Sequence, residues 1–382
     1  MGVRGADAAI LTPTPGKDRS WPLVVRRARE DDRDAVLSFA TRTWHDWDYI
    51  PHAWPIWLEA KDGAFLVGTV GEPADVSPAS LQDAEGNPLA VGQVVAITRV
   101  AMVSRTEAWL EGIRVDPRVR GMGVASDLQI AELHWVAGQD AQMLRYATGS
   151  NNEGSHRLGA RDGIVVVARF HAWWWSATGN AEDDADELSA FDSAVREQTT
   201  RNRQAALQSL AEVGLVVGAA GFDRLWQMID NDPTFIAGQR LYEPRPWGLQ
   251  ELTPELFHRH MMRGEVIADG HEAVAILVGE QLPAEDSSLR LATLVGRGPA
   301  AAELAGRMRR VIGYPFRFRV PVESPMIAGH EQLFRNEGFV TPEWELHVLA
   351  RPMEDPEQPI PADDPRRVVL AEPPDALEPP RW

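Results

Sequence analysis

The sequence predicts a mixed α/β (α+β) fold in two domains. The chain has 382 residues, which is more than one hydrophobic core usually organises. Segments that alternate or run apolar like strands are interspersed with segments whose apolar residues recur at helical spacing. The second half of the chain echoes the order of these segments in the first half, which predicts a repeated architecture.

In the first half, the pattern predicts a sheet with helices between its strands. The expected strands are Leu23–Ala28, Ala64–Val70, Ala90–Thr98, Glu107–Val115, Met143–Thr148 and Ile164–Trp175, and the expected helices are Asp31–Thr43, Ala53–Ala60 and a segment from Val124 to Gly138. In the last of these, Val124, Leu128, Ala131 and Trp135 recur at i, i+4, i+7 and i+11, which is one apolar helix face. Gly138 is a natural helix end.

The segment VDPRVRGMGVA, Val115–Ala125, joins a predicted strand to this helix. Pro117 cannot donate to a strand ladder, so the strand ends near it. Gly121 and Gly123 tolerate positive φ and leave no Cβ to hold a phosphate away. The first turn of a helix has unpaired N–H groups and a partial positive charge, and Arg120 adds a full one. We expect a phosphate cradle made by the backbone of Gly121, Met122, Gly123, Val124, Ala125 and Ser126 together with Arg120.

The pattern Val-x-Pro-x-x-Arg-Gly-x-Gly-Val-Ala resembles the acyl-CoA pyrophosphate loop of the GNAT superfamily of N-acetyltransferases. The resemblance implies acetyl-CoA as co-substrate and a central, mostly antiparallel mixed sheet flanked by helices. A second matching segment, Ser150–Ile164 (SNNEGSHRLGARDGI), follows at the expected distance. There the resemblance implies that Asn152 contacts the pantetheine arm of the cofactor, although an Asn in this context also reads as a helix N-cap.

One position departs from the family pattern. Family members often have a tyrosine seven residues after this asparagine, where its hydroxyl protonates the departing CoA thiolate, and this chain has Gly159. Ser155, His156 or water are the candidates to replace it. The departure also leaves room for a domain that binds CoA without turning over.

Acetyl transfer to an amine also needs a polarised carbonyl and a base. The backbone N–H groups of Ile113 and Val115, on the strand before the loop, are the candidates for the carbonyl, and Arg114 between them is a further expected cofactor contact. Strand alternation places Glu111 on the same face as Ile113 and Val115, so we favour Glu111 as base, with Glu107 next on that face. In the competing interpretation Glu111 caps a solvated sheet face or pairs with Arg114 or Arg118.

Aromatic residues with interleaved carboxylates suit a cationic amine. The candidates for the acceptor site are Trp44, Trp47, Trp54, His171 and Trp173, and ordinary core packing is the competing interpretation for each. His45, Asp46 and His52 match no strong metal-ligand spacing, so we expect no metal.

The second half predicts a degenerate copy of the same domain. Its expected strands are Val213–Ala219, Glu265–Ala268, Ala273–Gly279, Leu289–Val295, Phe316–Val320 and Trp344–Ala350, and its expected helices are Phe222–Ile229, Pro299–Ile312 and Met326–Asn336. The corresponding turn, LVGRGPAAAEL, lacks the phosphate-loop pattern. The resulting organisation is a loose N-terminus at 1–20, a catalytic domain at 21–178, a helical linker at 179–212, the degenerate domain at 213–353 and a Pro-rich, acidic tail at 354–382.

The composition limits which classes of molecule the protein is expected to bind and which chemistry it can use. A formal net charge of −18 argues against nucleic acid or an anionic membrane. The absence of cysteine excludes disulfides, a thiol nucleophile and thiolate metal sites. No signal peptide or membrane span is visible, so we expect a cytoplasmic protein. The sequence therefore predicts an N-acetyltransferase acting on a primary amine of a small molecule or peptide, with a catalytically silent CoA-binding module as the alternative. The second domain would complete the acceptor pocket or form the interface of a homodimer.

Overall fold

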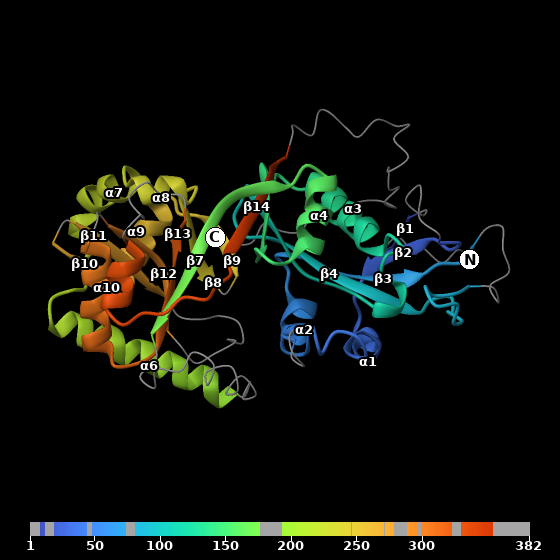
Figure 1. Cartoon of the computed structure of the whole chain (residues 1–382), viewed down its shortest axis with the longest axis horizontal. Coiled ribbons are helices and arrows are strands. Elements are labelled where there is room, and N and C mark those ends of the chain that lie inside the picture. The colour runs from blue at the N-terminus through green and yellow to red at the C-terminus, as the bar shows by residue number, and fades with distance from the viewer. Residues whose placement is uncertain are drawn as a thin grey trace. The chain divides into compact units, whose positions relative to one another are not determined.

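The chain folds into two compact units, each described by itself (Figure 1). The computed structural model describes residues 8–11, 19–43, 48–73, 81–175, 193–245, 247–270, 272–278, 289–296, 299–322 and 330–353. The first unit comprises Met1–Tyr146, Ala160–Gly163 and Ala350–Trp382, and the second comprises Ala147–Gly159 and Ile164–Leu349.

The first unit is built on a mostly antiparallel sheet. Its strands run in the order β1 (Ala8–Leu11), β2 (Leu23–Arg27), β3 (Gly63–Val70), β4 (Val94–Met102), β5 (Glu107–Val115) and β6 (Met143–Gly149, which continues into the second unit). Every neighbouring pair from β1 to β5 is antiparallel, and β5 then pairs with β6 in parallel. This parallel pairing covers only the first residues of β5, from Glu107 to Trp109.

Helices cover both faces of this sheet (Figure 1). They are η1 (Glu30–Asp32), α1 (Arg33–Leu37), α2 (Ile50–Glu59), η3 (Pro117–Val119), α3 (Val124–Ala137) and the last residues of α4 (Glu153–Arg161). α1 and α2 enclose one core with Phe65, Val67 and Ile97 of the sheet. α3 lies on the other face, where its predicted apolar stripe is buried, and Gly138 is its C-cap.

Glu132, on α3, is an ionisable group buried against the sheet. It is fully buried and accepts a hydrogen bond from the Thr98 hydroxyl on β4. Burial raises the pKa of Glu132 to about 8, and the Thr98 hydrogen bond lowers it only in part. The carboxyl group is therefore mostly protonated at neutral pH.

The second unit repeats this order of strands. Antiparallel strands β10 (Val266–Asp269), β11 (Ala273–Val278) and β12 (Leu289–Gly296) lead to β13 (Phe316–Pro321), which pairs with β12 in parallel. β13 is antiparallel to β7 (Val165–Trp175), which neighbours β14 (Leu346–Pro352). A separate hairpin consists of β8 (Leu241–Arg245) and β9 (Gly248–Glu251).

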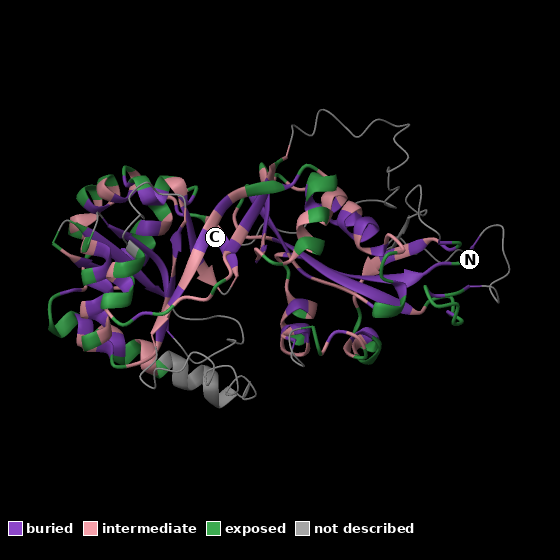
Figure 2. Ribbon diagram, viewed as in Figure 1, coloured by how far each residue is buried: buried purple, intermediate pink, exposed green. Residues whose placement is uncertain are grey.

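The helices of this unit pack in two different apolar cores. The helices are α6 (Ser193–Glu212), η5 (Ala219–Gly221), α7 (Phe222–Asp230), α8 (Pro233–Ala237), α9 (Pro254–Met262), α10 (Pro299–Ile312) and α11 (His330–Asn336). One core joins α6, α10 and α11 to the sheet, and the other joins α7, α8 and α9 to it. In both units the strands are mainly buried, whereas the helices expose their outer faces (Figure 2).

The predicted fold class, a mixed mostly antiparallel sheet flanked by helices, is confirmed. Several element predictions are wrong in detail. Val213–Ala219 is not a strand, because the chain there makes only an isolated bridge from Val216 to Ile267 before a 3-10 turn. Ala90 lies in a turn at Gly92, so β4 starts at Val94. The helix expected over Asp31–Thr43 ends at Leu37.

The segment predicted as a linker contributes to a core. Ala206 and Leu210 of α6 are fully buried among the residues packed by α10. The predicted tail at 354–382 and most of the predicted loose N-terminus lie outside the described residues.

Candidate active site

The turn between β5 and α3 has the geometry that the motif predicts. Gly121 and Gly123 adopt φ values of +80° and +84°, which side chains with a Cβ rarely allow. Asp116 accepts hydrogen bonds from the backbone N–H and the guanidinium of Arg118, so Arg118 is held within the turn. The exposed side chain of Arg120 also contacts the turn, where its Nε donates to the Val115 carbonyl at 3.4 Å.

The start of α3 presents backbone donors. The N–H of Asp127 is the first to bond back into the helix, to the carbonyl of Gly123 at 3.1 Å. The N–H groups of Val124, Ala125 and Ser126 precede it and have no intrahelical acceptor. Gly123 is the N-cap and has no side chain that could cap them. This end of α3 is therefore suited to bind an anion.

A second cation lies at this helix end. Arg161 is exposed, and its guanidinium donates to the Ser126 hydroxyl in the first turn of α3. Arg161 was not predicted from the sequence, because the contact joins residues 35 positions apart. Together with Arg120 it adds positive charge where the helix dipole already favours an anion.

β5 carries a bulge just before the turn. Ile97 pairs with Arg114 and Arg99 with Glu111, so Thr98 alone opposes both Gly112 and Ile113. Gly112 has φ +75°, and a Cβ there would lie 2.5 Å from the Trp57 ring. Only glycine fits this position, and the bulge reorients the strand beyond it.

The bulge leaves a candidate donor for the acetyl carbonyl. The N–H of Asp116 donates to Val95 on β4 at 2.9 Å, so the N–H of the preceding residue, Val115, faces the opposite edge of β5. On that edge the described pairing with β6 ends at Trp109. The backbone of Val115 thus lies at the edge from which β6 has diverged.

The prediction that Glu111 lies on the same face of β5 as Val115 is wrong. Because the bulge adds a residue, Glu111 shares its face with Arg114, and Val115 lies on the other face. That face is the one covered by α1 and α2, since Ile97 packs in their core. Simple alternation along β5 therefore does not place the Glu111 side chain beside the backbone of Val115.

The partner of Glu111 is Arg99, which none of the predicted pairings included. The Arg99 guanidinium contacts the Glu111 carboxylate and also the Asp62 carboxylate at 2.6 Å, and it lies over the Trp57 ring. Burial lowers the pKa of Arg99, but the two carboxylates outweigh it and raise the pKa above its ordinary value. Arg99 thus stays charged and fixes the carboxylate of Glu111.

Arg114 has a structural partner next to the bulge. Its Nε and Nη2 donate to the two carboxylate oxygens of Asp48 at 2.7 and 3.1 Å, and its guanidinium lies over the Tyr49 ring. Asp48 is fully buried and also accepts from the N–H of Ile50. This pair ties the start of α2 to β5, so the Arg114 side chain is engaged there and not at the phosphate loop.

A comparison with models of known protein families finds a match in this region. Residues 27–163 match the model of the Acetyltransferase (GNAT) family. The chain contains a GNAT-family acetyltransferase domain. Members of this family transfer acetyl groups from acetyl-CoA, which is their co-substrate. A comparison with curated protein sequences finds no match.

Solved structures with similar folds include three acetyltransferases. A GCN5-related N-acetyltransferase from Kribbella flavida is 13% identical, covers 87% of this chain and 71% of its own, and has a TM-score of 0.42. One from Sphaerobacter thermophilus is 13% identical with coverages of 86% and 95% and a TM-score of 0.43. The ribosomal-protein-S18-alanine N-acetyltransferase from Escherichia coli is 14% identical with coverages of 38% and 80% and a TM-score of 0.30.

The second acidic candidate in the GNAT domain, Glu107, is buried at the other end of β5. It forms an ion pair with Arg145 on β6, beside the parallel pairing of the two strands. Glu111, and not Glu107, is the acidic candidate next to the bulge.

Three predicted residues lie on α4, in the part assigned to the second unit. Asn152 caps this helix, because its side-chain oxygen accepts from the N–H of Ser155 at 3.2 Å, and its amide donates to Thr148. His156 follows one turn later on the same helix face, and its ring packs edge-on against His347. The capping role expected for Asn152 is thus confirmed.

The predicted acceptor residues divide into three groups. Trp44 and Trp47 lie outside the described residues. Trp54 is fully buried against Phe65, and Trp173 is 1% exposed against Phe334, so both indoles pack cores. The side chain of His171 is 23% exposed, and its ring lies 3.5 Å from the carboxylates of Glu331 and Glu345.

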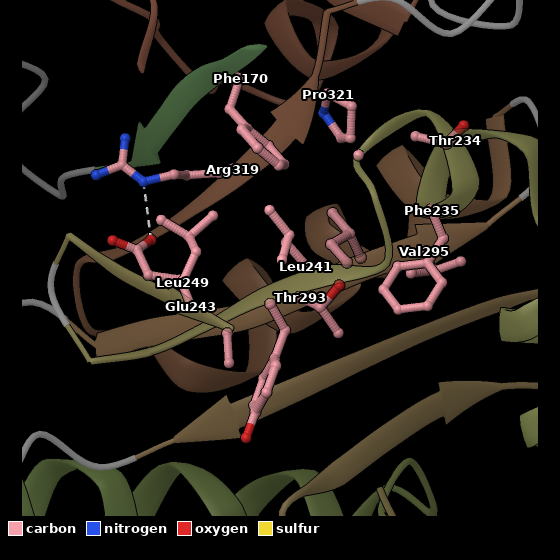
Figure 3. Close-up of a pocket in the computed structure, with 14 residues that line it drawn as sticks. Phe170, Thr234, Phe235, Leu241, Glu243, Leu249, Thr293, Val295, Arg319 and Pro321 are labelled. Atoms are coloured by element: carbon pink, nitrogen blue, oxygen red, sulfur yellow. Dashed lines mark hydrogen bonds and ion pairs between the residues drawn. The ribbon is translucent and has the colours of Figure 1, made fainter. Parts of the chain in front are cut away.

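The second unit contains a pocket beyond the paired part of β12 and β13 (Figure 3). Its lining is mainly apolar, with residues such as Phe170, Leu241 and Val295, and the ion pair of Glu243 with Arg319 lies at one end. Glu243, on β8, accepts from Arg319 on β13 at 2.8 Å and lies 2.9 Å from Arg290 on β12. Burial raises the pKa of Glu243, but the arginines outweigh it and lower the pKa to about 2.

Two further findings concern the described residues alone. None of the described helices is long and apolar enough to cross a membrane. In the same part of the chain, no group of three or more His, Asp or Glu side chains is arranged to hold a metal ion.

Proposed function

We propose that this chain is an N-acetyltransferase that transfers an acetyl group from acetyl-CoA to a primary amine of a small molecule or peptide. The observation that carries the proposal is the turn at Gly121 and Gly123, which leaves the first N–H groups of α3 without an intrahelical acceptor. Arg120 and Arg161 supply the charge that a pyrophosphate needs. The donor set is backbone amides and guanidinium groups, which fits a phosphate-bearing co-substrate.

In this proposal the bulge on β5 positions the reacting groups. Acetyl-CoA supplies an activated acyl group as a thioester. The N–H of Val115, at the edge of β5 that β6 has left, donates to the acetyl oxygen and stabilises its developing charge. Ile113 is the other backbone candidate, next to Gly112 in the bulge. Holding both substrates in one geometry contributes a large part of the rate.

Glu111 is the proposed base. Its carboxylate is fixed by Arg99, which itself is held by Asp62. This arrangement orients the Glu111 carboxylate, which receives the amine proton directly or through a water molecule. The net charge of −18 is consistent with a cationic amine approaching this protein.

The second unit is, in this proposal, a degenerate copy of the GNAT domain. The support is the shared order of three antiparallel strands, a helix and a parallel strand. Its helix α10 begins at Pro299, which cannot donate a backbone hydrogen bond. We therefore assign acetyl-CoA binding to the first unit alone.

The competing proposal is a CoA-binding module without turnover. The observation that favours it is Gly159, which stands where the resemblance implies a proton-donating tyrosine. This alternative shares the phosphate loop, so CoA binding cannot distinguish the two.

Release of free CoA from acetyl-CoA, measured against a panel of primary amines, tests the proposal. We expect release that depends on one class of amine, falls about 10²-fold or more in Glu111→Gln, and is lost in Gly123→Trp. Acetyl-CoA binding without release for any amine would favour the silent module. Release unchanged in Glu111→Gln would remove Glu111 as base while leaving the transferase.

A further inference from the structure

The pocket of the second unit has one charged end and one apolar end. Arg319 and Glu243 lie at the charged end, Phe235 and Val295 lie at the other end, and Leu241 lies between them (Figure 3). The residues that line the pocket come from strands β7, β8, β9, β12 and β13 and from α8 with its C-cap. All of them belong to the second unit, so the pocket is complete within that unit.

At the charged end, both carboxylate oxygens of Glu243 are engaged. Oε2 accepts a hydrogen bond from Nε of Arg319 at 2.8 Å. Oε1 accepts from the N–H of Trp247 at 2.8 Å and lies 2.9 Å from Nη1 of Arg290. Trp247 has a φ of +57°, which is uncommon for a residue with a Cβ, and the hydrogen bond to Glu243 helps to hold it there. Three neighbours thus fix the Glu243 carboxylate.

Arg319 has a donor that Glu243 does not reach. Its side chain is 9% exposed, and its Nη1 is buried without a hydrogen-bond partner among the described residues. The guanidinium is a rigid fork in which Nη1 points away from the Nε–H, so a carboxylate bound at Nε does not also bind Nη1. The Trp247 ring, whose centroid lies 5.2 Å from Cζ of Arg319, has a donor and no acceptor. A buried donor of this kind costs free energy unless an acceptor meets it.

The electrostatics of this end also favour an added anion. The pKa of Arg319 is lower than its ordinary value, mainly because burial disfavours the charge, and Arg290 and Arg317 lower it further. Glu243 offsets these effects only in part. Since arginine stays protonated at neutral pH, an anion in contact with Arg319 would make its charge less unfavourable.

We infer that this pocket binds a short-chain monocarboxylate, with the carboxylate on Arg319 and the hydrocarbon chain against the apolar lining. The carboxylate accepts a charge-assisted hydrogen bond from Nη1 of Arg319. The hydrocarbon chain lies toward Leu241 and Val295, where it removes apolar surface from water.

The charge of the lining favours a monoanion over a dianion such as phosphate. Among the described residues that line the pocket, Arg319 and Glu243 are the charged ones. A dianion would therefore meet one lining cation and the negative charge of Glu243 beside it. The site lies in the second unit, and its occupation does not depend on acetyl transfer.

Methyl NMR of the full-length protein, labelled at leucine and valine and titrated with sodium butyrate at constant ionic strength, tests this site. We expect saturable shifts of the methyl groups of Leu241, Leu249 and Val295, with a dissociation constant of about 1 mM or below. Butyramide has the same shape without the charge and should bind at least about tenfold more weakly. Chloride has the charge without the chain and should also bind at least about tenfold more weakly.

Arg319→Lys tests the contact with the carboxylate. Lysine keeps a positive charge beside Glu243 but lacks the second nitrogen of the fork, so the affinity for butyrate should fall at least about tenfold. Arg307→Lys is the matched control, because Arg307 lies on α10 of the same unit, outside the pocket lining, and its pair with Asp269 is about 40% exposed. Its affinity for butyrate should match wild type. If Arg319→Lys does not fold, the wild-type comparison of butyrate with butyramide still decides the question.

Three results would overturn the inference. Equal affinities for butyrate and butyramide, or for wild type and a folded Arg319→Lys variant, would remove the carboxylate contact with Arg319. Chloride that binds as tightly as butyrate would mean a site for simple anions, in which the apolar lining has no role. Methyl groups of Leu241, Leu249 and Val295 that do not shift would mean that butyrate does not bind in this pocket.

Discussion

Strands β5 and β12 each precede a helix and then a parallel strand, yet the residues at the starts of the two helices differ. The turn after β5 contains Gly121 and Gly123 in left-handed conformations and opens the start of α3. The turn after β12 leads from Gly296 to a helix that begins with Pro299. Strand order alone therefore positions a helix N-terminus, and the residues of the turn decide whether it can bind a phosphate.

The two units also differ in how each surrounds a buried glutamate. Glu132 of the first unit meets a neutral hydroxyl, and its pKa is raised to about 8. Glu243 of the second unit meets Arg290 and Arg319, and its pKa is lowered to about 2. In the second unit an ion cluster thus links β8, β12 and β13 beside the pocket, whereas the corresponding strands β5 and β6 of the first unit are joined by Glu107 and Arg145 at their paired ends.

The largest effect is expected for Glu243→Gln. Removing this carboxylate leaves buried guanidinium groups without their anion, so the free energy of unfolding should fall by about 3–5 kcal/mol in urea titrations. The affinity for acetyl-CoA of the folded variant should not change. Asp269→Asn is the control, because its pair with Arg307 is 40% exposed and should contribute less than about 1 kcal/mol. Equal losses for both variants would contradict a buried cluster.

Gly112→Ala should have the second-largest effect. The new Cβ would lie 2.5 Å from the Trp57 ring at φ +75°, which adds overpacking to backbone strain. We expect a loss of about 2–4 kcal/mol in unfolding free energy and a lower kcat, because the bulge positions the backbone of Val115. Gly313→Ala, at φ +68° in open space, carries the strain alone and should lose about 1–2 kcal/mol. If the two variants behave alike, the contact with Trp57 has no role in the bulge.

Gly121→Ala addresses the phosphate loop directly. Gly121 and Gly270 both have positive φ, +80° and +60°, and a Cβ added at either position would have no atom within 4 Å. Both alanine variants should therefore lose similar stability. Only Gly121→Ala should weaken acetyl-CoA binding, by about ten- to a hundredfold in calorimetry, because its Cβ holds the pyrophosphate away. Unchanged affinity would place the cofactor elsewhere.

The smallest effect is expected for Glu132→Gln, as a change in unfolding free energy for each pH unit. The folded-state pKa of Glu132, about 8, exceeds the ordinary 4.5, so the folded protein holds a proton that the unfolded chain releases between these values. Wild-type stability should fall with rising pH in this window by about 1.4 kcal/mol per pH unit relative to the glutamine variant. Unfolding at pH 5.5, 6.5 and 7.5 measures the difference. A difference that does not vary with pH would mean that Glu132 is ionised in the fold.

The loop could be predicted from sequence because its determinants are contiguous. Pro117, Gly121, Gly123 and the apolar face of α3 all lie within one strand–turn–helix segment. Simple alternation along β5 does not predict the bulge, although Gly112 inside a strand is the local signal for it. The pairing of Glu111 with Arg99 depends on the register of β4, which the β5 sequence does not contain.

The second unit was predicted less completely for similar reasons. Strand β8 contains Pro244, which argues against a strand when only the sequence is read. Glu243 and its arginines come from three separate strands, so no local pattern connects them. The approach of His347 to His156 joins residues almost 200 positions apart and depends on the pairing of the last strand.

The number of acetyl-CoA molecules bound per chain tests the central claim most directly. Calorimetric titration of the full-length protein should give one site, and Gly123→Trp should abolish it, because we assign acetyl-CoA binding to the turn between β5 and α3 of the first unit. Two sites in wild type, or one site that persists in Gly123→Trp, would contradict the assignment of acetyl-CoA to the turn between β5 and α3.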